Sequence, residues 1–233
     1  MSWQQDAERH AQAEAPREAC GLVVVVKGRS IYWPCRNTAL GADQFSIDPG
    51  DYACAEDTGE IVAVVHSHPD ATPDPSEADL VGCEASGLEW HIVGLPALVW
   101  RSIRPSGYRA PLVGRQFVHG VLDCYAIIRD WYRQERGVEL LDFERHDDWW
   151  LRGQDLYRQN FRAAGFEPCE ELHPGAVLLM QIQSPVPNHA AIYLGDDFIL
   201  HHLHGRLSSR DVFGGMWRKH TVTTLRYVGA GHA

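Results

Sequence analysis

The stretch RPSGYRAPLVG, residues 104–114, divides a chain of 233 residues into two parts. It contains two prolines and two glycines, the residue types that most strongly interrupt helices and strands. Domains usually contain about 100–200 residues, and each part is long enough to bury a core of its own. We therefore predict two domains, residues 1–105 and 106–233, joined at this stretch.

The part before the break alternates helical and strand patterns. GLVVVV at 21–26 and IVAVV at 61–65 are rich in β-branched residues and predict buried strands. Residues 4–15 favour a helix, which Pro16 ends. Further strands are expected at 30–35, 91–95 and 97–103, and further helices at 49–57 and 76–87. This order of elements predicts an α/β domain.

The part after the break has helices first and strands later. DCYAIIRDWYRQERG at 123–137 and DDWWLRGQDLYRQNFRAAG at 147–165 each predict an amphipathic helix. Strands are then expected at 177–183, 189–194, 197–202 and 221–228. Helices followed by a run of strands predict an α+β domain.

The charge balance and the apolar runs exclude several classes of protein. There are 31 acidic against 21 basic residues, a net charge of −10, and no basic run, which argues against nucleic-acid binding. The polar start MSWQQDAERHAQAEAPREAC lacks the apolar stretch of a signal peptide. The longest apolar run, LVVVV at 22–26, is too short to span a bilayer. We expect synthesis in a cytoplasm, without membrane insertion.

The stretch HSHPDATPDPSEAD, residues 66–79, directly follows a predicted buried strand. Side chains alternate along a strand, so His66 and His68 would lie on the same face. Two imidazoles and one carboxylate form a catalytic zinc set with a fourth position left to water, and Asp79 can supply the carboxylate. Ser76 and Asp79 also fit a helix capping box, which is a purely structural explanation for that pair. The joint pattern is much harder to obtain by chance than either part.

This pattern resembles the JAMM motif of the JAB/MPN metallopeptidases, which also contains a glutamate near the first long strand. Glu18 stands at that place in EACGLVVVV. The resemblance implies an α/β fold with a mixed sheet and flanking helices, in which His66, His68 and Asp79 hold zinc. It also implies that Glu18 is general base toward the attacking water and that Ser76 helps to hold the developing oxyanion. Zinc lowers the pKa of water to about 7, and a nearby carboxylate can take the proton.

A second group of chemically active residues lies after the break. Cys124 stands at a predicted helix start, after the capping residue Asp123, where the helix dipole favours a thiolate. In NHAAIYLGDDFILHH a hairpin would bring His189 and His201 close together, with His189 as base and His201 orienting its ring. The alternative is a core cysteine and a solvated polar tract at 201–204. Spacing alone does not decide between these interpretations.

The segments DCY, GAVLLM and NHAAIYLG, with a histidine twelve residues after the first, resemble the NlpC/P60 cysteine peptidases. The resemblance implies a papain-like α+β fold with Cys124 as nucleophile, His189 as base and His201 as the polar third residue. The chain departs from the family's D-C-S-G by reading DCYA at 123–126. Phe117 stands where the family often has a tyrosine that assists near the oxyanion.

A JAB-type domain followed by an NlpC/P60-type domain, at this length, resembles phage tail assembly (tail tip) proteins. The resemblance implies a bifunctional peptidase that hydrolyses peptidoglycan stem peptides with its second domain and an amide or isopeptide bond with its zinc domain. It would be made in the host cytoplasm and carried at the tail tip of the virion, with tail-tip proteins as partners. One alternative is a structural assembly factor whose two domains are docking modules. Another is a deubiquitinase-like enzyme, which the second domain fits poorly.

Overall fold

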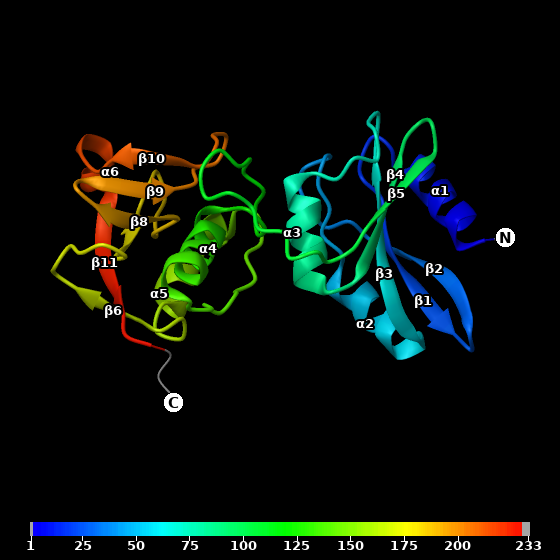
Figure 1. Ribbon diagram of the computed structural model, residues 1–233, viewed down its shortest axis with the longest axis horizontal. Helices are drawn as coiled ribbons and strands as arrows, with labels where there is room; N and C mark the ends of the chain where they lie inside the picture. The colour runs from blue at the N-terminus through cyan, green and yellow to red at the C-terminus, as the bar shows by residue number, and fades with distance from the viewer. Residues whose placement is uncertain (1, 230–233) are drawn as a thin grey trace. The chain divides into compact units, whose positions relative to one another are not determined.

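The computed structural model describes residues 2–229, and the chain divides into two compact units, Met1–Arg109 and Ala110–Ala233 (Figure 1). We call them the N-terminal unit and the C-terminal unit. The division falls inside the proline- and glycine-containing stretch 104–114. Across the described residues, no helix has the length and apolar character needed to cross a membrane.

The N-terminal unit is built on one mixed sheet. Its strands have the spatial order β2-β1-β3-β4-β5, in which β3 and β4 are parallel and the other neighbours are antiparallel. The elements in chain order are α1 (Trp3–Glu14), β1 (Cys20–Val26), β2 (Arg29–Cys35), α2 (Pro49–Thr58), β3 (Glu60–His68), α3 (Glu77–Ser86), β4 (Glu89–Gly94) and β5 (Val99–Ile103). The α/β class with a mixed sheet and flanking helices is thus confirmed.

Alternation along β1 divides its side chains between two helical layers. Val24 packs with Ala55 of α2 and Cys83 of α3, whereas Val23 packs with Ala7 of α1. Accordingly α1 covers one face of the sheet and α2 and α3 cover the other (Figure 1). Because apolar residues fill both faces of β1, the strand is a near-continuous apolar run in the sequence.

The C-terminal unit has a six-stranded antiparallel sheet of order β10-β9-β8-β7-β11-β6. Its elements in chain order are α4 (Cys124–Arg136), the 3₁₀ helix η1 (Trp149–Arg152), α5 (Leu156–Asn160), β6 (Phe166–Cys169), β7 (Val177–Met180), β8 (His189–Gly195), β9 (Phe198–His201), β10 (Ser209–Val212), α6 (Gly215–His220) and β11 (Thr221–Tyr227). The α+β class expected for this half is confirmed.

The two faces of this sheet have separate cores. Ile128 of α4 packs with Leu179 and Ile192 on one face, and Trp217 of α6 packs with Ile199 on the other. The apolar stripe of α4 therefore lies on β8 and β9. Cys124 at the start of the helix is hydrogen-bonded to the backbone of Ala190 in β8.

The single helix expected over 147–165 is wrong. The chain instead forms the short helices η1 and α5, because Gly153 takes a left-handed conformation with φ of 77° between them. Asp155 then caps α5 by accepting from the backbone N–H of Arg158 at 3.3 Å. Strands β6 and β10 and helix α6 were not anticipated, since each is too short to give a clear periodic signal.

Candidate metal and cysteine sites

Strand β3 presents its two terminal histidines toward α3. Val64 and Trp90 lie in the core cluster on the α2/α3 face, and alternation puts His66 and His68 on that same face. The ring of Phe45 stacks on His66 with 4.6 Å between ring centroids, and Trp90 lies edge-on at 5.5 Å. These aromatic contacts fix the orientation of His66, whose side chain is fully buried.

The carboxylate comes from the first turn of α3. Ser76 is the N-cap: its Oγ accepts from the backbone N–H of Asp79 at 3.1 Å, and Asp79 Oδ2 accepts from the Ser76 N–H at 2.7 Å and from the Ser76 hydroxyl at 2.8 Å. The capping box is therefore present. It also aims Asp79 at the histidines, with Oδ1 3.1 Å from His66 Nε2 and Oδ2 3.4 Å from His68 Nε2.

The donor atoms of His66, His68 and Asp79 all lie within 4.8 Å of one another. The two Nε2 atoms are 3.1 Å apart, and His68 Nδ1 lies 3.0 Å from the carbonyl oxygen of Thr72. A carbonyl only accepts, so His68 Nδ1 carries a proton, and Nε2 is the nitrogen that faces Asp79 and that could bind a metal once it has lost its own proton. Two nitrogen donors and one carboxylate that face a common point fit zinc better than a hard cation, which prefers oxygen.

Glu18 lies just before β1, at the same end of the sheet. Ala19 holds it there by exchanging two hydrogen bonds with Ser67, at 2.9 and 3.0 Å. Burial raises the pKa of Glu18 to about 8, an effect that the charge of His68 opposes and that of Asp79 reinforces. A carboxyl group that titrates near neutrality is suited to accept and return a proton.

The Asp79 carboxyl and its histidine neighbours are strongly coupled. Burial alone would raise the pKa of Asp79, but hydrogen bonds from His66 and His68 hold it well below its usual range. Burial lowers the pKa of His66, whereas for His68 the hydrogen bonds to Asp79 and Thr72 outweigh burial and raise it. The carboxylate thus stays ionised and available as a ligand.

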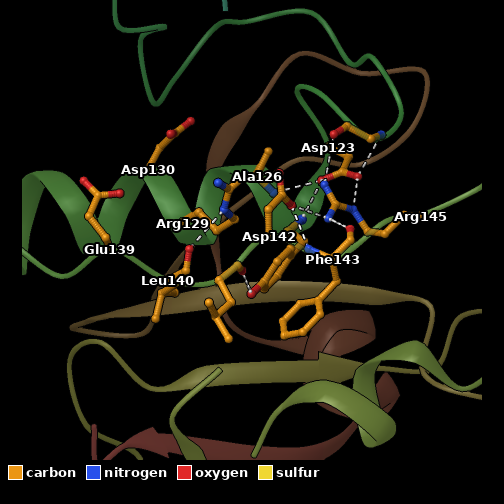
Figure 2. A network of polar contacts seen from close by, with 12 residues as sticks. Asp123, Ala126, Arg129, Asp130, Glu139, Leu140, Asp142, Phe143 and Arg145 are labelled. Atoms are coloured by element: carbon orange, nitrogen blue, oxygen red, sulfur yellow. Dashed lines mark hydrogen bonds and ion pairs between the residues drawn. The ribbon is translucent and has the colours of Figure 1, made fainter. Parts of the chain in front are cut away.

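In the C-terminal unit, Asp123 caps α4 immediately before Cys124. Its Oδ1 accepts from the backbone N–H groups of Tyr125 at 3.0 Å and Ala126 at 2.8 Å. Figure 2 shows Arg145 reaching the same carboxylate, with Arg145 Nε 2.7 Å from Asp123 Oδ2. Burial would raise the pKa of Asp123, but the charge of Arg145 and these hydrogen bonds lower it.

The Cys124 sulfur has a hydroxyl group as its neighbour. Its Sγ lies 3.1 Å from the hydroxyl oxygen of Tyr157 on α5, rather than in a hydrogen bond with an imidazole. Burial, followed by the charge of Asp123, raises the pKa of Cys124 to about 11, while Tyr157 and the backbone of Ala190 lower it. Burial of the sulfur thus opposes the thiolate that the helix start is expected to favour.

The two histidines of the β8–β9 hairpin meet as the sequence suggests. His189 Nε2 lies 3.1 Å from His201 Nδ1, and His201 Nε2 lies 3.1 Å from Asp211 Oδ2 on β10. The carboxylate accepts from His201 Nε2, so His201 Nδ1 can accept from His189 Nε2. This arrangement leaves the lone pair of His189 on Nδ1. Burial lowers the pKa of His189 to about 3, with the charges of His201 and His202 adding to the effect, so the ring is neutral.

Lowering the pH is expected to destabilise the C-terminal unit. The pKa of His202 is also lowered, to about 4, by burial and then by the charge of Arg115. In the unfolded chain His189 and His202 would titrate near 6.5, so below that pH the unfolded state binds more protons and folding stability declines as the pH falls toward about 4. Hydrogen exchange of α4 peptides, corrected for intrinsic rates, should show this loss. A His202→Gln variant should show a shallower decline, and a flat profile in both proteins would contradict the argument.

Three residues of these sites were missed at the sequence level, namely Arg145, Tyr157 and Asp211. Each comes from a segment without a motif and is brought to its partner by the fold. Phe117 lies against the rings of His202 and His204, at 5.1 and 5.3 Å between centroids.

The chain is similar to known proteins over both units. The model of the prokaryotic homologs of the JAB domain matches residues 2–105, and the NlpC/P60 family model matches residues 114–226. Tail tip assembly protein K of Escherichia phage N15 is 42% identical over 225 residues, covering 94% of this chain and 91% of that protein. The chain belongs to the tail tip assembly protein K family.

Two further similarities of this K-family member cover less of the chain. Tail tip assembly protein K of Escherichia phage lambda is 43% identical and covers 78% of this chain and 89% of that protein. A JAB1/MPN domain protein from Archaeoglobus fulgidus is 20% identical, with a TM-score of 0.32, over 46% of this chain and 87% of that one. The resemblance to tail tip proteins with a JAB/MPN domain followed by an NlpC/P60 domain is thus confirmed.

Proposed function

We propose that this protein is a component of a phage tail tip and that it has two hydrolytic activities. The C-terminal unit would hydrolyse peptidoglycan stem peptides with Cys124. The N-terminal unit would cleave an amide or isopeptide bond at a zinc site. The observation that best supports this proposal is a hydrogen-bonded series in which His189 contacts His201 and His201 contacts Asp211. The same unit carries Cys124 at the start of α4. A nucleophile, a base and groups that orient the base are the requirements of covalent acyl transfer.

In the cysteine unit, His189 would take the thiol proton as Cys124 Sγ bonds to the carbonyl carbon of the stem peptide. The carbon–nitrogen bond then breaks, and the amine leaves with the proton that His189 returns. Water would hydrolyse the resulting thioester, giving the free acid and restoring the thiol. His201 and Asp211 would keep the His189 ring in the tautomer that this proton transfer needs.

In the N-terminal unit, His66, His68 and Asp79 would hold zinc, which when bound polarises a carbonyl and makes water more acidic. Glu18 would accept a proton from the attacking water and pass it to the leaving amine. Ser76 would donate to the developing oxyanion after its hydroxyl turns away from Asp79, with which it is hydrogen-bonded here.

Cys124→Ala is expected to abolish the release of muropeptides from purified sacculi. Without sulfur no thioester forms, so the loss should exceed about 1,000-fold. Mass spectrometry of the soluble products gives the bond that is cut. The matched control is Cys169→Ala, which removes another partly exposed thiol of the same unit and should retain full activity. Equal release by wild type and Cys124→Ala would refute the proposal.

A second candidate function is structural assembly alone, which the names of the phage relatives favour. In that case both units dock tail-tip proteins and neither cuts a bond. Infective particles formed with a Cys124→Ala/Asp79→Asn double variant as well as with wild type would support this alternative. In either case the protein would be made in the host cytoplasm and then join the virion tail.

A further inference from the structure

Tyr157 brings a hydroxyl group to the sulfur of Cys124 from a distant part of the chain. Its oxygen lies 3.1 Å from Cys124 Sγ, although the two residues are 33 positions apart. The phenol ring is held edge-on against Trp149 and Tyr125, at 5.8 and 6.5 Å between centroids. Two aromatic neighbours thus orient the ring that makes this contact, and the ring is not a free surface side chain.

The phenol keeps its proton at this position, and with a neutral thiol either the hydroxyl or the thiol can be the donor. Burial, together with the charges of Cys124 and Asp123, raises the pKa of Tyr157 well above 10. A phenol that keeps its proton can donate a hydrogen bond to the thiol or to the thiolate. That hydrogen bond is strongest when the sulfur is anionic. Deprotonation of the thiol is thus the step at which this contact strengthens.

The other groups that act on the sulfur come from three further segments. Asp123 at the helix start disfavours the thiolate, whereas Arg145 and the backbone of Ala190 in β8 favour it. Arg145 is already paired with Asp123, which offsets much of its charge. The Tyr157 hydroxyl, like the Ala190 backbone, is a neutral partner whose effect on the sulfur is not offset by a counter-charge.

We propose that Tyr157 is a catalytic residue of the cysteine site, whose hydroxyl donates to Cys124 Sγ as the thiol proton moves to His189. The assignment rests on the proposed function of this site. No bond to Tyr157 is made or broken: the proton passes from sulfur to imidazole, and the phenol keeps its own. Tyr157 would thus lower the barrier to forming the nucleophile.

The test is the pH profile of Cys124 alkylation by iodoacetamide, followed by mass spectrometry of the peptide that contains it. Tyr157→Phe removes the hydroxyl and keeps the ring. We expect the apparent pKa of Cys124 to rise by about one unit or more, so that alkylation below the pKa slows about tenfold. The matched control is Tyr132→Phe, which removes a hydroxyl that donates to the Gly175 carbonyl at 2.6 Å and should leave the profile unchanged.

Identical alkylation profiles of wild type and Tyr157→Phe would overturn the assignment. Should Tyr157→Phe fold poorly, wild type and Cys124→Ala can be compared by carbon NMR of labelled tyrosines. The Tyr157 Cζ resonance should then differ between the two proteins, and an unchanged resonance would also overturn it. Both measurements report on the Cys124–Tyr157 contact and need no substrate. If the protein did not cleave sacculi, the proposed function would be refuted, but the effect of Tyr157 on the sulfur could still be measured.

Discussion

Asp79→Asn should abolish stoichiometric zinc binding by the N-terminal unit. The substitution removes the only carboxylate of the cluster while keeping an oxygen that can cap α3. Loss of an outer-shell partner already costs about 10–100-fold in affinity, and loss of a ligand should cost more. Metal analysis after dialysis against a dilute zinc buffer measures the effect. One zinc per chain is expected in the wild type and none in the variant.

The matched control is Asp74→Asn in the same loop. Asp74 is exposed and is bonded to Thr72 and Arg101 rather than to the histidines. This variant should bind zinc like the wild type. Zinc at about 100 times its dissociation constant should also stabilise the wild-type unit by about 2.7 kcal/mol. A wild-type protein that takes up no zinc would refute the metal site, whatever the variants do.

Chelation should not affect the cysteine site, whose residues include no member of the metal cluster. If a chelator stops muropeptide release as completely as Cys124→Ala does, the assignment of separate chemistries to the two units is wrong.

Arg145→Met is expected to destabilise the C-terminal unit by about 3–5 kcal/mol. The side chains of Arg145 and Asp123 are only 6% and 2% exposed, so the variant leaves a buried carboxylate without its counter-charge (Figure 2). Arg145 also donates to the carbonyl groups of Gly120 and Phe143, which lie on both sides of the capped helix start. Urea unfolding followed by hydrogen exchange of α4 peptides gives the free energy of unfolding of this unit.

Arg129→Met provides the matched control, because Arg129 binds Asp142, whose side chain is about half exposed. That pair should contribute less than about 1 kcal/mol. A double variant Arg145→Met/Asp123→Asn should recover most of the loss, since the amide can still cap α4 and carries no charge. Equal destabilisation by Arg145→Met and Arg129→Met would contradict the argument that burial makes the Arg145–Asp123 ion pair more important for stability than the Arg129–Asp142 pair.

The elements and motifs with a strong local signal could be predicted from the sequence. Alternation along 61–68 is sufficient to place His66 and His68 on one face, and the S-x-x-D pattern is sufficient to start α3 at Ser76. The β8–β9 hairpin likewise follows from two apolar runs around a Gly-Asp-Asp turn, which brings His189 to His201. Each of these inferences uses residues close together in the chain.

The remaining site residues depend on tertiary packing. Tyr157 reaches Cys124 from α5, a separate helix that begins after Gly153 interrupts the helix expected over 147–165. Asp211 lies on a four-residue edge strand whose alternation is too short to recognise. Composition and periodicity also could not show that burial would raise the pKa of Cys124, because burial is a property of the folded chain.

The two carboxylate oxygens of Asp79 make different contacts, and this limits which substitutions the metal cluster can accept. One oxygen faces His66, while the other is shared between the Ser76 cap and His68. An ion held by this carboxylate would therefore be coupled to the first turn of α3, and fraying of that turn would be expected to weaken its binding. Substitutions in the 69–75 loop are therefore expected to be tolerated only if they preserve the distance between the end of β3 at His68 and the start of α3 after Ser76.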